Sequence, residues 1–276
     1  MISRPFGPTD VTAPIIGQGT WKIDADGLEA LNLGIELGMK HIDTAEMYTG
    51  AEQVVAEAIR SRREKIFLVS KVLPSNASYQ GTLRACDTSL KRLKTSYLDV
   101  YLLHWWSGAH PIADTMRAME ELVAAGKIRH IGVSNLDVDQ LKQAQRALKR
   151  EKIVCNQVLY HLRSRGIERR LLPYCESQKI AVVGYSPFGQ GDFPAKSSKQ
   201  GRVLSVIASK HGRTARQVAL NFLTRRNSLF AIPKAANPDH VRENAGAAGW
   251  ELDDEDLVSI DSAFPPPSKD KPLDML

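Results

Sequence analysis

Residues 98–104 read Leu-Asp-Val-Tyr-Leu-Leu-His, a mostly apolar run that ends on an imidazole. Residues 66–71 read Ile-Phe-Leu-Val-Ser-Lys and end on an ammonium group in the same way. Short runs that are apolar at nearly every position are typical of parallel strands whose two faces are both covered. The two segments therefore predict strands of an α/β sheet that carry polar groups at their carboxyl ends.

Runs of this kind recur along the whole chain, separated by helical segments with one apolar face. The expected strands are 14–19, 41–43, 66–71, 98–104, 128–133, 153–157, 180–185 and 229–233. Between them, apolar residues recur at spacings of three and four, which indicates helices that pack one face on a sheet. Eight such units close most naturally as a (β/α)8 TIM barrel.

The barrel pattern extends over residues 1–276, for which we expect a single domain. The seventh unit is irregular, with a turn-rich loop over 187–200 followed by helical segments at 203–210 and 214–225. An extra C-terminal helix is expected over 253–264, and residues 265–276 form a polar, proline-rich tail.

Charge and composition argue against several classes of protein. The net charge is 37 − 31 = +6, but the densest basic runs, 60–65, 91–94 and 163–170, also contain acids or helix-forming residues. Such runs are typical of solvated helix faces, so we expect no nucleic-acid partner. The N-terminus lacks an apolar signal core and no run of about 18 apolar residues occurs, so no membrane association is expected.

The cysteines indicate the compartment. Cys86, Cys155 and Cys175 are odd in number, show no metal-type spacing and fall in apolar periodic segments. Buried thiols in a reducing compartment are therefore favoured over a disulfide framework. We expect a cytoplasmic protein, and a monomer.

Four polar residues stand at or just beyond the ends of three consecutive expected strands: Asp43, Tyr48, Lys71 and His104. In a barrel, the carboxyl ends of the strands meet at one rim, where reactive groups gather. A tyrosine with an ordinary pKa of about 10 is a poor acid near neutrality, and a neighbouring ammonium lowers that pKa. The carboxylate keeps the lysine charged and the imidazole orients a carbonyl oxygen, so the group predicts carbonyl chemistry.

Each of these residues also has a plain structural explanation when taken alone. Asp43 could cap a helix, Tyr48 could be a loop aromatic, Lys71 a surface cation and His104 a core histidine. Their common placement at strand ends is what favours a shared site.

Seven short motifs, in order from about Gly17 to Asn244, resemble the aldo-keto reductases, in particular a prokaryotic-type member with short loops. The motifs are Asp43-Thr44-Ala45 with Tyr48, Ser70-Lys71, Leu102-Leu103-His104-Trp105, Gly132-Val133-Ser134-Asn135, Asn156-Gln157, Tyr185-Ser186-Pro187 and Ile232-Pro233-Lys234. Each motif is weak, whereas seven in order are highly specific.

The resemblance implies NADPH-dependent, metal-free reduction of aldehydes and ketones, with a small carbonyl compound as the substrate. Tyr48 would donate the proton, Lys71 and Asp43 would tune it, and His104 would orient the carbonyl. The implied cofactor residues are Gly19, Thr20, Trp21, Ser134, Asn135, Gln157, Tyr185, Ser186, Pro187, Gly189, Ile232, Lys234, His240, Glu243 and Asn244. Trp21, Met47, Tyr48, His104 and Trp105 would line the substrate pocket, with core packing as the alternative for the tryptophans.

The chain departs from the family pattern where the adenosine phosphate would bind. Lys234 is present, but the family usually follows it with serine and then arginine, where this chain has Ala235 and His240. Histidine is largely neutral at pH 7 and offers a phosphate less than the planar, charged fork of arginine. Arg242 is a candidate substitute. We expect NADPH as the cofactor, with NADH use as an alternative.

Two other functions remain as alternatives. Some relatives of this fold are cofactor-binding regulatory or adaptor subunits with little turnover, although only the short tail could serve here as an interaction extension. An unrelated barrel enzyme with metal chemistry fits poorly, because no histidines and carboxylates share metal-ligand spacing and no metal is expected. The remaining histidines considered, His110, His130, His161 and His211, are scattered.

Overall fold

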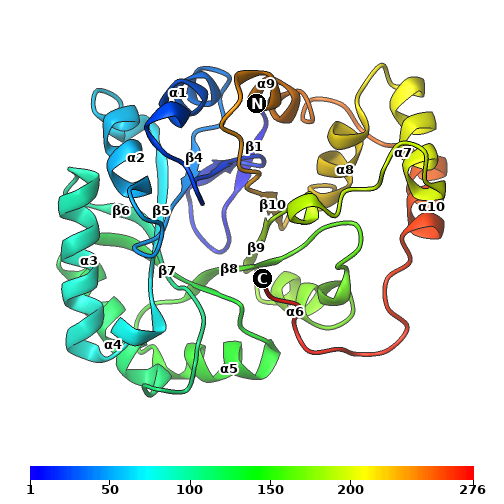
Figure 1. Cartoon of the computed structure of the whole chain (residues 1–276). Coiled ribbons are helices and arrows are strands. Elements are labelled where there is room, and N and C mark those ends of the chain that lie inside the picture. Colours follow the sequence, from blue (N-terminus) through cyan, green and yellow to red (C-terminus); the bar gives the residue numbers. More distant parts are fainter.

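The structure is a computed structural model that describes residues 1–276, and its centre is a sheet of eight strands. The strands lie in the order β10-β9-β8-β7-β6-β5-β4-β3, and neighbouring strands are parallel. Isolated parallel bridges join Ile16 to Ala231 and Gly19 to Lys234, so the β3 edge meets the β10 edge. The sheet is thereby closed and helices surround it (Figure 1), which confirms the predicted (β/α)8 barrel.

The helices alternate with the strands as predicted. The barrel strands are β3 (Gln18–Gly19), β4 (His41–Asp43), β5 (Phe67–Val72), β6 (Leu98–Leu103), β7 (Ile128–Ser134), β8 (Ile153–Leu159), β9 (Ala181–Tyr185) and β10 (Leu229–Ala231). The helices are α1 (Leu28–Glu36), α2 (Ala51–Ile59), α3 (Tyr79–Leu93), α4 (Ile112–Ala124), α5 (Val138–Ala147), α6 (Leu171–Ser177), α7 (Lys199–Lys210), α8 (Ala215–Leu223), α9 (Pro238–Ala245) and α10 (Asp254–Ala263).

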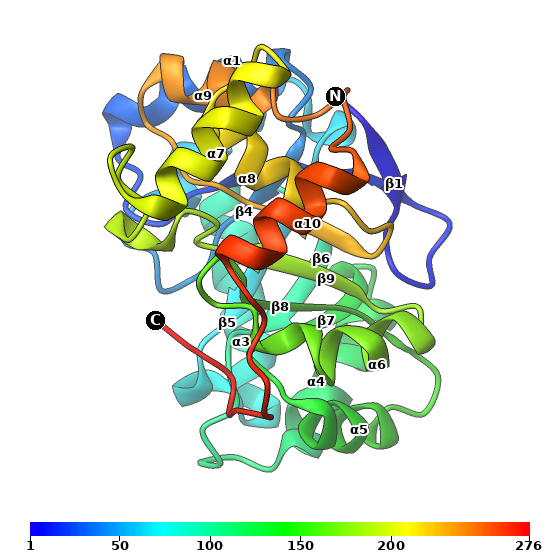
Figure 2. The same ribbon diagram turned by 90° about the vertical axis from the view of Figure 1, so that its right-hand side faces the viewer.

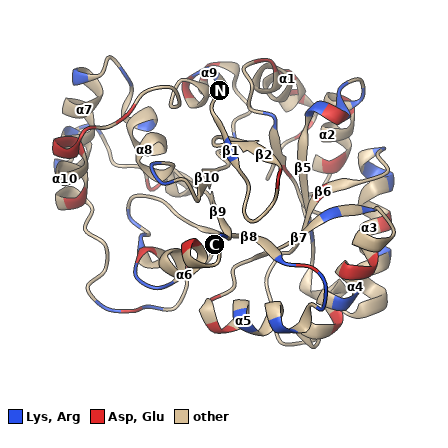
Figure 3. Cartoon of the chain, turned by 180° about the vertical axis from the view of Figure 1, so that it is seen from behind, with Lys and Arg blue, Asp and Glu red and all other residues tan.

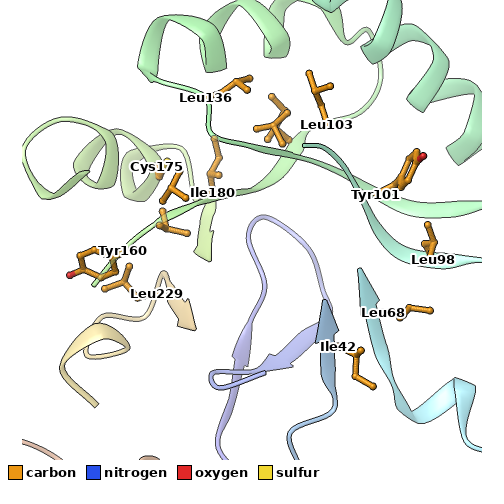
Figure 4. Close-up of a cluster of buried hydrophobic side chains, with 14 of the residues drawn as sticks. Ile42, Leu68, Leu98, Tyr101, Leu103, Leu136, Tyr160, Cys175, Ile180 and Leu229 are labelled. Carbon is orange, nitrogen blue, oxygen red and sulfur yellow. The ribbon is translucent and has the colours of Figure 1, made fainter. Parts of the chain in front are cut away.

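Side chains alternate along each strand between two layers of hydrophobic core, one against the helices and one inside the barrel. On β5, Leu68 and Val72 belong to the cluster that faces the helices, whereas Phe67 and Val69 belong to the cluster inside the barrel. Successive side chains point to opposite faces of a strand, so Lys71 points inward with Phe67 and Val69. The outer layer contains Ile42, Leu68, Tyr101 and other side chains between the sheet and the helices (Figure 4).

An N-terminal hairpin is an element that the sequence analysis missed. β1 (Ser3–Pro5) and β2 (Thr12–Pro14) pair antiparallel outside the barrel sheet. Phe6 of this hairpin is buried against the rings of His41, Phe67 and Phe230.

The expected strand over 14–19 was therefore wrong as one element. It divides into the end of β2 and the short β3, because Gly17 lies against His41: a Cβ atom on Gly17 would lie 2.5 Å from the carbonyl oxygen of His41. The chain can approach β4 this closely only at a glycine.

The remaining elements differ from the prediction by a few residues at their ends. β8 continues to Leu159, and α7 begins at Lys199 where Ser198 caps its first turn. The expected C-terminal helix is confirmed as α10, after which the tail passes near α6 (Figures 1 and 2). None of the helices combines the length and apolarity needed to cross a membrane. Both basic and acidic residues are spread over the helices seen from behind, except on α10, where only acidic residues are coloured (Figure 3).

Candidate active site

The four predicted polar residues lie together at the carboxyl ends of β4, β5 and β6. The Lys71 ammonium donates to Oδ1 of Asp43 at 2.5 Å and to the carbonyl oxygen of Thr44 at 2.9 Å. The same Nζ atom lies 5.0 Å from the centre of the Tyr48 ring. The Tyr48 ring meets the His104 ring edge to face, with their centroids 5.8 Å apart. The phenol therefore has an ammonium on one side and an imidazole on the other.

Asp43 and Lys71 form a buried ion pair, with side-chain exposures of 2% and 0%. The other carboxylate oxygen of Asp43 accepts a hydrogen bond from Nε2 of Gln157 at 2.7 Å. Burial lowers the pKa of Lys71, but the attraction of Asp43 and of Tyr48 outweighs it and the pKa is raised. Lys71 is therefore charged at neutral pH.

His104 is neutral over the physiological range. Burial, with the Lys71 charge acting in the same direction, lowers the pKa of His104 to about 3. Its Nδ1 atom is buried and has no hydrogen-bond partner. A neutral imidazole can donate one N–H group to a carbonyl oxygen without adding a positive charge to the site.

The sequence-based expectation for the acidity of Tyr48 was wrong in its net direction. Burial raises the pKa of Tyr48, and although the Lys71 charge opposes this effect, the pKa stays above its ordinary value. The desolvation of a phenolate by the surrounding barrel is a tertiary effect that residue types and spacing do not reveal. Tyr48 thus keeps its proton at neutral pH and can act as a proton donor.

A cavity of about 680 Å³ opens beside these side chains. Asp43, Tyr48 and His104 contribute to its lining, while Lys71 lies behind them. Trp21, Met47 and Trp105, which the sequence analysis expects in the substrate pocket, form part of its wall. Trp106 lines a separate cavity, and its Nε1 donates to the carbonyl oxygen of His110 at 2.9 Å.

Residues 15–264 of this chain match the model of the aldo/keto reductase family. The chain belongs to the aldo/keto reductase family. It is 46% identical over 275 residues to the methylglyoxal reductase YeaE of Escherichia coli, covering 97% of this chain and 96% of that protein. It is 36% identical over 256 residues to the glyoxal reductase of Bacillus subtilis, covering 91% and 89% of the two chains.

Solved structures agree with this assignment. The aldo-keto reductase from Klebsiella pneumoniae in complex with NADPH superposes with a TM-score of 0.93 at 42% identity, covering 100% of both chains. The crystal structure of an aldo/keto reductase from Klebsiella pneumoniae in complex with NADP and acetate gives 0.90 at 42% identity and covers 99% of both chains. The chain is thus an oxidoreductase of this family with its barrel complete.

Most of the cofactor residues implied by the family resemblance lie around the cavity. The lining includes Gly19, Thr20, Trp21, Ser134, Asn135, Gln157, Tyr185, Ser186, Pro187, Ile232 and Lys234. Gly189, His240, Glu243 and Asn244 do not line it. The last three belong to α9, whose first turn is capped by the Asn237 side chain.

Another part of the cavity wall offers hydrogen bonds and an aromatic ring. The Tyr185 hydroxyl donates to Oδ1 of Asn135 at 3.1 Å, and Nδ2 of Asn135 donates to the carbonyl oxygen of His104 at 3.2 Å. Asn135 has a φ of +58°, so it turns into the cavity, and Asp137, not Asn135, caps α5. Because the Gln157 amide nitrogen is bound to Asp43, its oxygen is free to accept. This donor and acceptor set fits a carboxamide beside a planar ring, as a nicotinamide has.

Three cavity residues were not predicted: Lys22, Met275 and Leu276. Phe188 and Gln190 also line the cavity, and they belong to the loop after Ser186, which the family resemblance assigns to covering the pyrophosphate. Lys22 directly follows Trp21, and its ammonium lies 4.2 Å from the centre of the Trp21 ring. Its position next to a predicted cofactor residue was the signal that could have found it. Met275 and Leu276 are brought back by the tail, where Asp274 accepts a hydrogen bond from the Ser164 hydroxyl at 2.6 Å. No local pattern marks them.

A group of potential metal ligands forms away from the catalytic residues, contrary to the expectation that no such cluster would exist. His211, Asp253 and Asp256 place one ligand atom each within 4.8 Å of one another. The Lys210 ammonium already lies among them, 2.5 Å from Asp253 and 3.1 Å from Asp256. Asp253 and Asp256 also form the capping box of α10. The cluster therefore has a structural explanation, which is the attachment of α10 to α7.

Proposed function

We propose that this protein reduces small aldehydes and ketones to alcohols with NADPH, using Tyr48 as the proton donor. The observation that carries the proposal is the contact of a protonated phenol with a buried ammonium and a neutral imidazole beside one cavity. Those groups supply a proton and orient a carbonyl oxygen, and family membership supplies the reaction class.

The residues of the chain divide the chemistry as follows. His104 donates a hydrogen bond to the carbonyl oxygen and holds it near the Tyr48 hydroxyl. Tyr48 transfers its proton to that oxygen, and the Lys71 charge stabilises the phenolate that forms. Asp43 keeps Lys71 charged and is itself held by Gln157. When bound, NADPH supplies the hydride.

The choice of NADPH draws on the solved structures and on the cavity. Two similar proteins from Klebsiella pneumoniae have been solved with NADP and NADPH. Ser134, Asn135 and Gln157 would hold the carboxamide, and Tyr185 would stack on the nicotinamide ring. Lys22 and Lys234 provide positive charge at the same cavity for the phosphates. NADH is the second cofactor to test, because Ala235 and His240 weaken the phosphate site.

The substrate that we propose is a small dicarbonyl compound. The chain is similar to a methylglyoxal reductase and to a glyoxal reductase. The pocket wall near Tyr48 includes Trp21, Met47 and Trp105, whose side chains are apolar or aromatic and carry no charge. A short, uncharged compound with adjacent carbonyl groups fits such a pocket.

Replacing Tyr48 by phenylalanine tests the proposal. The variant keeps the ring but lacks the proton, so we expect turnover of methylglyoxal to fall by about 10²–10⁴-fold. Its dissociation constant for NADPH, followed by tryptophan fluorescence, should stay within about twofold. Tyr79→Phe, at the half-buried first residue of α3, is the control. Turnover by Tyr48→Phe at the wild-type rate would disprove the role of Tyr48.

We also infer that residues 1–276 act as one domain, as a cytoplasmic monomer. The hairpin and the tail both pack on the same barrel, and the three cysteines are buried free thiols. Sedimentation of the purified protein tests the monomer. Absence of turnover with a broad panel of carbonyl compounds, together with a stable protein partner, would favour the adaptor alternative.

A further inference from the structure

The loop that carries Tyr48 continues the pairing of β4 with β5 beyond the ends of the strands. The Thr44 amide donates to Val69 at 2.9 Å, and the Glu46 amide donates to Lys71 at 3.3 Å. The carbonyl oxygen of Ala45 instead accepts from the Tyr48 amide at 3.0 Å, which turns the chain back. The main chain therefore leaves the strand pairing just before Tyr48.

Where the main chain leaves the strand pairing, the side chain of Glu46 accepts the next hydrogen bond from the β5 segment. Its Oε1 atom accepts a hydrogen bond from the Leu73 amide at 2.5 Å, and its Oε2 atom accepts one from the Asn76 side chain at 3.0 Å. Arg92 of α3 donates to the carbonyl oxygen of Glu46 at 3.4 Å. Both carboxylate oxygens of Glu46 are thus bound to the segment that follows β5, and its main chain is bound to β5 and to α3.

The hydrogen bonds of the Glu46 side chain connect the Tyr48 loop to the end of β5, which carries Lys71. Glu46 is two residues before Tyr48, and Leu73 is two residues after Lys71. The loop on the far side of Tyr48 ends at Gly50, which has a φ of +76° and no atom near its missing Cβ. Beyond Tyr48 the loop is held by main-chain hydrogen bonds alone, since the Ala51 amide of α2 donates to the carbonyl oxygen of Tyr48 at 3.0 Å. Glu46 is therefore the side chain that holds the loop on the other side of Tyr48.

We propose that Glu46 is a positioning residue that holds Tyr48 over Lys71, an inference that depends on the proposed role of Tyr48 as proton donor. A carboxylate that accepts two N–H groups makes stronger hydrogen bonds than a neutral acceptor would. Without it, the loop keeps only main-chain hydrogen bonds, and the phenol is no longer held at its distance from the ammonium. A displacement of about 1 Å at a reacting group can lower the rate by about 100-fold.

Three substitutions test this proposal on the full chain. Glu46→Ala should lower kcat for methylglyoxal about 10- to 100-fold, while the dissociation constant for NADPH changes by less than about twofold. Glu46→Gln should recover kcat to within about threefold of wild type, because its amide oxygen can accept from Leu73 and its amide nitrogen can donate to a turned Asn76 side chain. Glu57→Ala, on the exposed side of α2 where Glu57 pairs with Lys94, is the matched control and should not change kcat.

A pH titration separates positioning from a general loss of structure. Burial is the larger influence on the pKa of Tyr48 and raises it despite the Lys71 charge, so a phenol that leaves its buried place over Lys71 should ionise at lower pH in Glu46→Ala than in wild type. The ionisation of Tyr48 is measured as the phenolate absorbance of each protein minus that of its Tyr48→Phe counterpart. Should Glu46→Ala not fold, Asn76→Ala, which removes one of the two contacts, should show a smaller shift in the same direction.

The outcomes are distinguishable from failure of the proposed function. If wild type reduces no carbonyl compound, the proposed function fails, but the absorbance titration still tests the position of Tyr48. An unchanged Tyr48 titration in both Glu46→Ala and Asn76→Ala, or wild-type kcat in Glu46→Ala, would overturn the role of Glu46. A loss of kcat that Glu46→Gln does not recover would also count against it.

Discussion

The Nζ atom of Lys71 lies 2.5 Å from Oδ1 of Asp43, and neither side chain has more than 2% of its surface exposed. A buried charge of one sign is tolerated only when a partner and further hydrogen bonds replace the lost water. Thr44 and Gln157 provide those hydrogen bonds. Loss of either member of the pair should therefore change both the charge in the site and the free energy of unfolding.

Asp43→Asn should lower both stability and activity. It leaves the Lys71 charge buried without its partner, so the free energy of unfolding should fall by about 3–5 kcal/mol. Urea unfolding measures the loss. Asp87→Asn, which breaks the exposed pair with Lys127, is the control and should cost at most about 1 kcal/mol.

The double variant Asp43→Asn with Lys71→Met should recover much of that stability, because it removes the unpaired charge. It should not recover turnover, since the phenolate would lack its cation. Equal destabilisation in the single and double variants would show that the charge of Lys71 is not the cause.

The rate of carbonyl reduction should be nearly independent of pH between 6 and 9. His104, whose pKa is lowered to about 3, stays neutral throughout this range, and burial keeps Tyr48 protonated. A decline is expected only above about pH 10, where the proton donor is lost as Tyr48 ionises. Initial rates at saturating NADPH give the profile. An alkaline decline centred near pH 8 would contradict the raised pKa of Tyr48.

His41 should make the barrel sensitive to acid. Burial among Phe6, Phe67 and Phe230 lowers its pKa from 6.5 to about 4, so the folded state favours the neutral ring. The free energy of unfolding is then unaffected above pH 6.5 and falls as the pH drops from 6.5 to 4. The difference amounts to about 3 kcal/mol at completion and about 2 kcal/mol by pH 5.

Urea unfolding of His41→Leu at pH 7.5 and pH 5 measures this contribution. The loss between the two pH values should be about 2 kcal/mol smaller in the variant than in wild type. His240→Leu, at an exposed histidine of α9, serves as the control. An equal loss in wild type and His41→Leu would assign the acid sensitivity to other groups.

His240→Arg should increase the preference for NADPH. The family pattern places arginine at this position, and a guanidinium group binds a phosphate through a charged, two-pronged contact. We expect the dissociation constant for NADPH to fall by about five- to tenfold, equal to about 1 kcal/mol, with NADH unchanged. Fluorescence titration measures both. Equal tightening of both cofactors would indicate that His240 does not face the adenosine phosphate.

Much of the fold could be predicted because the alternation of apolar runs and one-sided helices is a local signal. The inward direction of Lys71 follows from the period of two along β5. The placement of three strand ends at one rim follows from the parallel order of a barrel. The seven motifs then identified the family.

The features that the sequence pattern did not predict depend on contacts between segments that are distant in the chain. Asp43 and Gln157 are 114 residues apart, and Met275 reaches the cavity only because Asp274 is bound to Ser164. The split of the first expected strand arises from the close contact of Gly17 with His41.

The sequence by itself determined which groups reach the rim, because side-chain direction along a strand is set by the backbone. Only the tertiary structure decided how strongly those groups are desolvated, and burial raises the pKa of Tyr48 despite the adjacent Lys71 charge. Desolvation depends on every atom packed around a group, whichever part of the chain supplies it. For that reason the residue that we propose as the proton donor could be named from residue types, whereas the direction of its pKa shift could not.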